Sequence, residues 1–385
     1  MVEVTPGIDA IVGPDWRARA ERRRERIQAR LGDRSEVILF GSGFLGRLIA
    51  DDLAGLPFTA LAFVDNNPSA WASTVAGLEV VSPAAALERF GSSPLWLITV
   101  YTNGSVIRQL EALGVPWMTC AELSWLLPEP HPQGFEFGTP DTLGRWDVQI
   151  AAAAELWADE ASAREYADQV RWRFLLDYDA LAAPRPMSEL YFPDDLIVPL
   201  ARETFVDCGA YTGDTVDAFL AKRSGAFERI IAIEPDPVNC AALRKRIPDW
   251  TRSGEGTVRV EVAAVGAERG RLQFTGTGTA GSKVGAGSLV VDVAPLDELL
   301  AGDRPTYMKF DVEGAEHDAL AGGARVISEA LPVLAICLYH RPEDIWDLPL
   351  LVRSIAPGYR LFMRRYSDER WETVLYAVPP ARSRS

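Results

Sequence analysis

The chain has 385 residues, of which 48% are hydrophobic and 24% are charged. These values are those of globular proteins, so they exclude a disordered or fibrous chain, and the length favours two or three domains. The formal net charge is −15, from 39 basic and 54 acidic residues. Such a charge opposes binding to nucleic acids and anionic membranes, and it favours a small cationic ligand.

Four cysteines are far apart in the sequence, with no C-x-x-C pair: Cys120, Cys208, Cys240 and Cys337. This spacing predicts small buried thiols in a reducing compartment, not zinc ligands or disulfides. The apolar runs are far shorter than the ~20 residues that a membrane-spanning helix needs. No secretory apolar segment opens the chain. We therefore expect a cytoplasmic protein without a membrane span.

Residues 15–32 predict one helix that is rich in arginine and interleaved with Glu21 and Glu25. A basic arm for nucleic acid is one interpretation. A solvated helix that packs through a few apolar residues, or pairs with a partner chain in a homo-oligomer, agrees better with the mixed charges.

Two series of alternating strands and helices follow. The first has expected strands at 37–40, 60–64, 80–81, 95–101 and 116–118, and the second at 204–206, 229–233, 258–263, 307–310 and 333–338. A hairpin is expected at 359–363 and 373–378. The fold class is therefore α/β, with two doubly wound Rossmann-like domains joined by a helical bridge.

The expected boundaries follow from composition. Residues 1–35 form an N-terminal helix, 36–130 a nucleotide-binding-like domain, 131–200 a linker and helical bridge, and 201–380 a second domain. Pro and Gly residues at 131–139 predict the linker, and apolar spacing over 147–181 predicts a helix. From its position, this helix is expected to cap a substrate pocket.

The first glycine cluster follows a strand and opens a helix, which is the context of a dinucleotide-binding turn. An acidic residue that could bind ribose ends the next strand. The predicted second nucleotide site comprises Gly41, Gly43, Phe44, Leu45, Gly46 and Asp65. A domain that has lost or changed its ligand is the alternative. Residues 63–68, with Gly77 and residues 80–83 behind them, resemble the small nucleotide-sugar-binding domains attached to sugar-modifying enzymes.

The second glycine cluster has the form D-x-G-x-x-x-G-D, from Asp207 to Asp214. Carboxylates on both sides of the turn suit a ligand with a positive centre and no pyrophosphate, as in S-adenosylmethionine (SAM). Glu234 ends the next strand, where it would accept hydrogen bonds from both ribose hydroxyls.

A third group, Lys309, Asp311, Glu313 and Glu316, lies at the end of a later strand, where open α/β sheets hold their ligands. Charged groups in a sheet interior need partners. A helix N-terminus that favours acidic residues would explain Glu313 and Glu316, but not Lys309 together with Asp311. His340 follows the next strand. Its role is either structural or catalytic.

Residues 191–379 resemble the FkbM-type SAM-dependent methyltransferases. The matching motifs, in order, are Val206-Asp207-Cys208-Gly209-Ala210-Tyr211-Thr212-Gly213-Asp214, Glu234-Pro235, Ala263-Ala264-Val265-Gly266, Pro295-Leu296-Asp297-Glu298-Leu299, Lys309-Phe310-Asp311-Val312-Glu313-Gly314-Ala315-Glu316, Tyr339-His340 and Glu372-Thr373-Val374-Leu375-Tyr376. The resemblance implies a class I methyltransferase fold, SAM as methyl donor, and a hydroxyl of a sugar, glycan or secondary metabolite as acceptor. It also implies a cofactor site of Asp207, Gly209, Ala210, Tyr211, Gly213, Asp214, Thr215, Glu234, Pro235, Asp236, Ala264 and Asp311.

A hydroxyl is a poor nucleophile until a base or a metal accepts its proton. We expect His340 to be the base, with Asp311 as its orienting group or as an alternative base. Lys309 would stabilise these carboxylates or a developing alkoxide. Alternatively, Asp311 and Glu313 would hold Mg²⁺, which prefers carboxylate oxygens.

Two other functions remain open. The first is an NAD-dependent sugar oxidoreductase or epimerase that uses the Gly41–Gly46 turn, although the chain has no Tyr-x-x-x-Lys pair. The second is a non-catalytic module that binds a nucleotide sugar.

Overall fold

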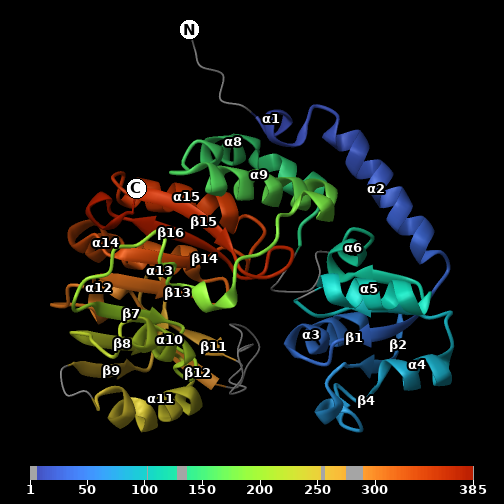
Figure 1. Cartoon of the computed structure of the whole chain (residues 1–385), viewed down its shortest axis with the longest axis horizontal. Helices are drawn as coiled ribbons and strands as arrows, with labels where there is room; N and C mark the ends of the chain where they lie inside the picture. The colour runs from blue at the N-terminus through green and yellow to red at the C-terminus, as the bar shows by residue number, and fades with distance from the viewer. Residues whose placement is uncertain (1–6, 102, 128–136, 253–255, 275–288, 385) are drawn as a thin grey trace.

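The computed structural model describes residues 7–101, 103–127, 137–252, 256–274 and 289–384. It consists of two α/β units, each built on its own sheet, with helices α8 and α9 lying across the top (Figure 1). The expected fold class is confirmed. Most of the expected linker at 131–139 lies outside the described residues. None of the helices in the described ranges is both long enough and apolar enough to cross a membrane.

The N-terminal unit is a six-stranded sheet in the order β3-β4-β2-β1-β5-β6, parallel except for β3. Its strands are β1 (Glu36–Phe40), β2 (Thr59–Val64), β3 (Thr74–Val75), β4 (Leu78–Val81), β5 (Leu95–Ile98) and β6 (Trp117–Thr119). Its helices are α3 (Phe44–Leu53), η1 (Pro68–Ala70), α4 (Pro83–Phe90), α5 (Asn103–Leu113) and α6 (Cys120–Ser124). Strand β1 is buried except at its first residue, as expected for a central strand covered on both faces.

Several short and long helices lie between and beside the two units (Figure 1). They are α1 (Ile8–Val12), α2 (Trp16–Leu31), α7 (Pro140–Leu143), η2 (Gly144–Trp146), α8 (Asp147–Ala154), α9 (Glu160–Leu175), η3 (Tyr178–Ala180) and η4 (Met187–Glu189). The single helix expected over 147–181 is therefore two helices, because Asp159 caps a new helix by accepting a hydrogen bond from the Ser162 amide at 2.8 Å.

The C-terminal unit is a seven-stranded sheet in the order β15-β16-β14-β13-β7-β8-β9. Its strands are β7 (Thr204–Cys208), β8 (Arg229–Ile233), β9 (Thr257–Glu261), β13 (Tyr307–Phe310), β14 (Val333–Cys337), β15 (Arg360–Arg365) and β16 (Thr373–Val378). Its helices are α10 (Asp214–Lys222), α11 (Pro237–Trp250), α12 (Leu296–Leu299), α13 (Glu316–Gly322), α14 (Ala324–Ala330) and α15 (Asp344–Ile355), and η5 (Pro380–Arg382) ends it.

In this sheet the last strand in the chain, β16, runs antiparallel and inserts between β14 and β15. Strands β8 and β13 lie parallel to β7 on its two sides, and the order in which strands are added reverses there, so β7 lies at the topological switch point where such sheets bind ligands. A smaller sheet of β10 (Ala264–Val265), β11 (Gly270–Phe274) and β12 (Leu289–Ala294) was not expected.

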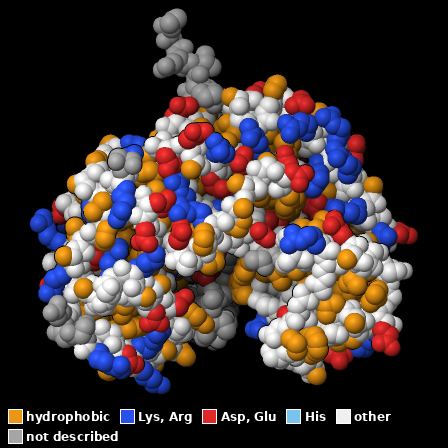
Figure 2. Space-filling view, viewed as in Figure 1, with side chains coloured by type: hydrophobic (Ala, Val, Ile, Leu, Met, Phe, Trp, Pro, Cys, Tyr) orange, Lys and Arg blue, Asp and Glu red, His pale blue; other side chains and the backbone are white. Residues whose placement is uncertain are grey.

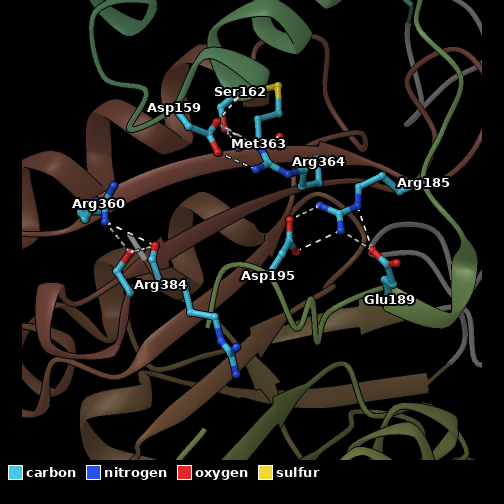
Figure 3. A network of polar contacts seen from close by, with 10 residues as sticks. Asp159, Ser162, Arg185, Glu189, Asp195, Arg360, Met363, Arg364 and Arg384 are labelled. Carbon is cyan, nitrogen blue, oxygen red and sulfur yellow. Dashed lines mark hydrogen bonds and ion pairs between the residues drawn. The ribbon is translucent and has the colours of Figure 1, made fainter. Parts of the chain in front are cut away.

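Buried polar contacts hold the bridge against the C-terminal sheet (Figure 3). The Arg364 guanidinium on β15 donates to both carboxylate oxygens of Asp159, at 2.6 and 3.3 Å. The Ser162 hydroxyl accepts a hydrogen bond from the Met363 amide at 3.0 Å. The start of α9 is therefore fixed to one edge strand.

A second contact in Figure 3 orients the segment that follows α9. Arg185 donates to both oxygens of Asp195, at 2.9 and 3.0 Å, and also to Glu189. This clamp holds η4 in place and presents Met187 and Tyr191 to the C-terminal sheet.

The two units meet through buried polar and aromatic contacts. Glu369, which is 4% exposed, accepts hydrogen bonds from Asn103 at 2.5 Å and from the Tyr178 hydroxyl at 3.0 Å. Burial raises the pKa of Glu369 to about 7, an increase that the Tyr178 hydrogen bond and the charge of Arg370 only partly oppose. Tyr101 packs edge-on against Trp371 at 4.6 Å.

Replacing Arg364 with leucine should leave Asp159 without its main partner and lower the free energy of unfolding by about 2 kcal/mol, less than for a fully buried pair because Asp159 is partly exposed. The midpoint of thermal unfolding measures this loss. Arg164→Leu on α9 removes an exposed ion pair with Glu160 and should change the free energy of unfolding by less than about 0.5 kcal/mol. Equal effects of the two substitutions would contradict the role of the Arg364 contact.

Candidate active site

A pocket of about 420 Å³ opens at the carboxyl ends of β7, β8 and β13. This is the size of a small-molecule site. The turn after each of these strands contributes to its wall, together with η4 and two residues of the N-terminal unit, Phe44 and Tyr101. The helix expected to cap the pocket, at 147–181, contributes no lining residue; the cap is the segment from Met187 to Tyr191.

The glycine-rich turn after β7 leaves no room for a side chain at Gly209. Its φ is +80°, and a Cβ atom there would lie 1.9 Å from the carbonyl oxygen of Asp311. Gly213 has a φ of +92°, and a Cβ atom there would meet the Trp250 ring at 2.5 Å. These two glycines therefore let the turn pass close to the β13 loop and to α11.

Lys309 is a buried cation between two carboxylates. Its ammonium, 1% exposed as a residue, lies 3.2 Å from Asp207 and 3.5 Å from Asp311 and donates to the Gly209 carbonyl at 2.8 Å. Burial alone would lower the pKa of Lys309, but the two carboxylates outweigh it and raise that pKa well above its usual value. Burial raises the pKa of Asp207 to about 6, although Lys309 opposes this. The cation links β7, its turn and β13.

Glu234 ends β8 at the pocket, as expected. Its two oxygens accept backbone hydrogen bonds, one from Tyr211 at 2.9 Å and one from Asp236 at 3.0 Å. Burial raises the pKa of Glu234 and is the largest effect on it, against the hydrogen bonds that lower it. Oε1 also accepts from the Asn239 side-chain amide at 3.3 Å, so the remaining capacity to accept a ligand hydroxyl lies chiefly on Oε2.

The predicted cofactor residues divide into two groups. Those in the pocket wall are Gly209, Tyr211, Asp214, Thr215, Glu234, Pro235, Ala264 and Asp311. Those outside the wall are Asp207, Ala210, Gly213 and Asp236. The second group supports the first, since Asp207 is fully buried against Lys309 and Asp236 caps α11 by accepting from the Val238 amide.

His340 lies among three carboxylates, one at Nδ1 and two at Nε2. Its Nδ1 lies 2.8 Å from the Oε1 of Glu316, and both residues are at most 2% exposed. Its Nε2 faces Asp311 at 3.4 Å and Glu313 at 3.7 Å. Glu316, on the first turn of α13, contacts Nδ1, and Asp311, the expected orienting group or alternative base, lies on the Nε2 side of the ring, which lines the pocket.

The charges around His340 set its proton affinity. Burial alone would lower the pKa of His340, but Glu316, Glu313 and Asp311 outweigh it and raise that pKa to about 10. Burial raises the pKa of the Glu313 carboxyl. Burial alone would raise the pKa of Asp311, but the charges of Lys309 and His340 outweigh it and hold the pKa of that carboxyl below its usual range.

Two tyrosines complete the surroundings of Asp311. The Tyr191 hydroxyl donates to one oxygen at 3.0 Å and the Tyr339 hydroxyl to the other at 3.3 Å. Neither tyrosine was predicted as a site residue. Tyr191 comes from the bridge, 120 residues before Asp311, and no motif marked it.

Among the described residues, one group of three side chains has ligand atoms close enough together to share a metal ion, namely Asp311, Glu316 and His340. This set does not fit Mg²⁺, which prefers oxygen ligands and retains several waters. Glu316 Oε1 already accepts from the Val312 amide at 2.8 Å and contacts His340 Nδ1, and the Lys309 ammonium lies beside Asp311.

The N-terminal glycine turn faces the same pocket through Phe44. It is a tight turn, since a Cβ atom at Gly46 would lie 2.0 Å from the Gly41 carbonyl oxygen. Asp65, predicted to bind ribose, accepts hydrogen bonds from the Ser42 amide and hydroxyl at 3.1 and 2.6 Å. Leu45 is 3% exposed and packs into the core.

Residues 207–369 match the family model described as the methyltransferase FkbM domain. This part of the chain is similar to the FkbM methyltransferase domains. The match supports methyl transfer as the general type of reaction. The matched segment contains the glycine turn, Glu234 and the His340 cluster.

The crystal structure of a methyltransferase FkbM from Methylobacillus flagellatus KT is similar to this chain, with a TM-score of 0.72 and 23% identity. The alignment covers 95% of this chain and 99% of that one, so the two share a fold over nearly their whole lengths. The CurJ carbon methyltransferase aligns with a TM-score of 0.30 and 11% identity over 98% of each chain, too low to indicate a common fold. No curated protein matches the chain significantly.

Substituting Lys309 with methionine should leave Asp207 and Asp311 as uncompensated buried carboxylates in the C-terminal unit. We expect a loss of about 3 kcal/mol in the free energy of unfolding, measured by chemical denaturation. Lys222→Met, which breaks a pair with the exposed Asp194, is the matched control and should have little effect. An unchanged stability of the Lys309 variant would contradict the assigned role.

Proposed function

We propose that the protein transfers a methyl group from SAM to a hydroxyl group of a sugar-containing acceptor. The observation that carries this proposal is the position of His340, whose Nε2 faces the pocket while Glu316 holds its Nδ1. Glu234 and the Gly209 turn lie in the wall of the same pocket.

The residues fit SAM as the methyl donor. The Glu234 carboxylate can accept from the ribose hydroxyls, and Asp214 begins α10 at the pocket wall, where it can pair with an ammonium group. The acidic wall suits a cation, and Gly209 lets a ligand approach the backbone closely. When bound, SAM supplies a methyl group on a positively charged sulfur.

His340 is the proposed general base. To accept the hydroxyl proton, its Nε2 must be neutral, and Glu316 then stabilises the imidazolium that forms. Asp311 ionises readily because its pKa is low, so it is available to orient the acceptor hydroxyl. Lys309 is buried behind Asp311 and acts by holding it in place, not by contacting the acceptor.

The pocket walls favour a sugar. Tyr101, Tyr339 and Trp371 line it with ring faces and edges, and a sugar ring presents apolar faces as well as hydroxyls. Because Phe44 follows the N-terminal glycine turn and also lines the pocket, a nucleotide at that turn would direct an attached sugar toward His340. A nucleotide sugar is therefore the proposed acceptor, and metal participation is not required.

Calorimetric titration with S-adenosylhomocysteine tests the cofactor site. We expect 1:1 binding by the wild type and a loss of about 10- to 100-fold in affinity for Glu234→Gln, since hydrogen bonds to a charged group contribute about 1.5–3 kcal/mol. Glu228→Gln, whose side chain is largely exposed, should bind like the wild type. Absence of binding by the wild type would contradict SAM as the donor.

The pH dependence of kcat/KM tests the base. Because carboxylates raise the pKa of His340 to about 10, the protonated form dominates at pH 7, and the rate should rise with pH through and beyond the usual histidine range. Glu316→Gln removes the strongest of these carboxylates and should shift the rising limb to lower pH.

Asp318→Asn, on the same helix but exposed, is the control for that shift and should leave the profile unchanged. His340→Ala should reduce turnover by at least about 100-fold while retaining affinity for S-adenosylhomocysteine. A kcat/KM that does not depend on pH would contradict the role of His340 as the base. So would a pH profile that is the same in the wild type and in Glu316→Gln.

A further inference from the structure

A second cavity, of about 600 Å³, lies between α2, the N-terminal unit and the end of α9. Five arginines of α2 line it: Arg19, Arg22, Arg23, Arg26 and Arg30. The space-filling view shows blue basic side chains gathered over this helix (Figure 2). The cavity shares no lining residue with the active-site pocket.

These arginines share one face of α2 because their spacing follows the helical repeat of three and four residues. Other arginines of this helix are engaged elsewhere: Arg17 lies over the Trp16 ring at 4.2 Å, and Arg24 donates to the Trp125 carbonyl at 3.2 Å. The arginines of α2 therefore form two sets, one that lines the cavity and one that makes contacts outside it.

The positive charge in the cavity is only partly balanced. The buried carboxylate of Glu122 pairs with Arg23 at 3.1 Å and with Arg30 at 2.5 Å. Asp177 and Asp179 also line the cavity, so five arginines stand against three carboxylates. The buried Nε atoms of these two arginines nonetheless have no hydrogen-bond partner among the described residues. Arg22 comes no closer than 4.0 Å to its carboxylate neighbour Asp15.

Apolar and aromatic groups also line the cavity. Arg30 lies over the Trp117 ring at 5.1 Å, and Ile107, Leu175 and Leu176 extend this wall. Guanidinium groups prefer phosphate and carboxylate oxygens, and an aromatic ring offers a stacking surface for a base.

We propose that this cavity binds a nucleoside diphosphate, with its phosphates on Arg22 and Arg26 and its base beside Trp117. The volume suits a small molecule, and the acidic surface elsewhere opposes a long polyanion such as nucleic acid. This site is separate from the methyl-transfer pocket and does not depend on the function proposed for it.

The cavity also borders the junction of the two units. Tyr178 lines it, and its hydroxyl hydrogen-bonds to Thr119 at 2.7 Å and to Glu369 at 3.0 Å. Glu369 is the residue that Asn103 reaches from the N-terminal unit. A ligand here would contact the residues that connect the units.

Calorimetric titration of the full chain with UDP at low salt tests the proposal, with uridine and pyrophosphate as partial probes. The double variant Arg22→Gln/Arg26→Gln should lose one UDP site or weaken it at least tenfold, and rising salt should weaken the wild-type site. Arg17→Gln, on the same helix outside the cavity, should bind like the wild type. Binding of S-adenosylhomocysteine by the double variant should be unchanged, which separates this test from that of the methyl-transfer site.

Gly43→Leu separates this cavity from the N-terminal glycine turn, because a Cβ atom at Gly43 meets no atom within 4 Å and the larger side chain would fill the space above the turn. The arginine site should persist in that variant. Absence of UDP binding by the wild type would overturn the proposal. So would binding that Gly43→Leu abolishes and the double arginine variant retains.

Discussion

The buried ammonium of Lys309 is the contact on which the rest of the active site depends. It lies between the carboxylates of Asp207 and Asp311 and donates to the carbonyl of Gly209. Strands β7 and β13 are neighbours at the switch point of the sheet, and one cation joins their ends. Because the carboxylates outweigh its desolvation, the charge is retained in an apolar setting, and the position of the glycine turn relative to Asp311 is fixed.

From that fixed point the pocket extends in two directions. Asp311 lies between two tyrosine hydroxyls and faces the Nε2 of His340, which Glu316 holds from behind. On the other side, Tyr101 of the N-terminal unit packs on Trp371, so the pocket is closed by the contact between the units. The segment that matches the FkbM family model lies in the C-terminal unit, whereas the choice of acceptor is proposed to depend on both units.

The parts of the site that follow a strand were predictable from the sequence, since parallel strands bring the residues after them to one edge. Glu234, Asp311 and His340 are of this kind. Glu316 belongs to the same motif as Asp311. Its pairing with His340 was not predictable, because it depends on the direction of the first turn of α13. The contacts of Tyr191, Tyr101 and Phe44 join segments far apart in the chain, and no local pattern encodes such contacts. The break between α8 and α9 had a signal in Asp159 followed by Ser162, a helix-capping pair.

The central claim, methyl transfer from SAM to a sugar hydroxyl, is tested most directly by following a ¹³C-labelled methyl group from SAM into a panel of nucleotide sugars by NMR. We predict a methoxy carbon in the product, formed in step with S-adenosylhomocysteine. A label found on carbon or nitrogen would contradict the claim, and so would transfer to acceptors that contain no sugar while nucleotide sugars remain unlabelled.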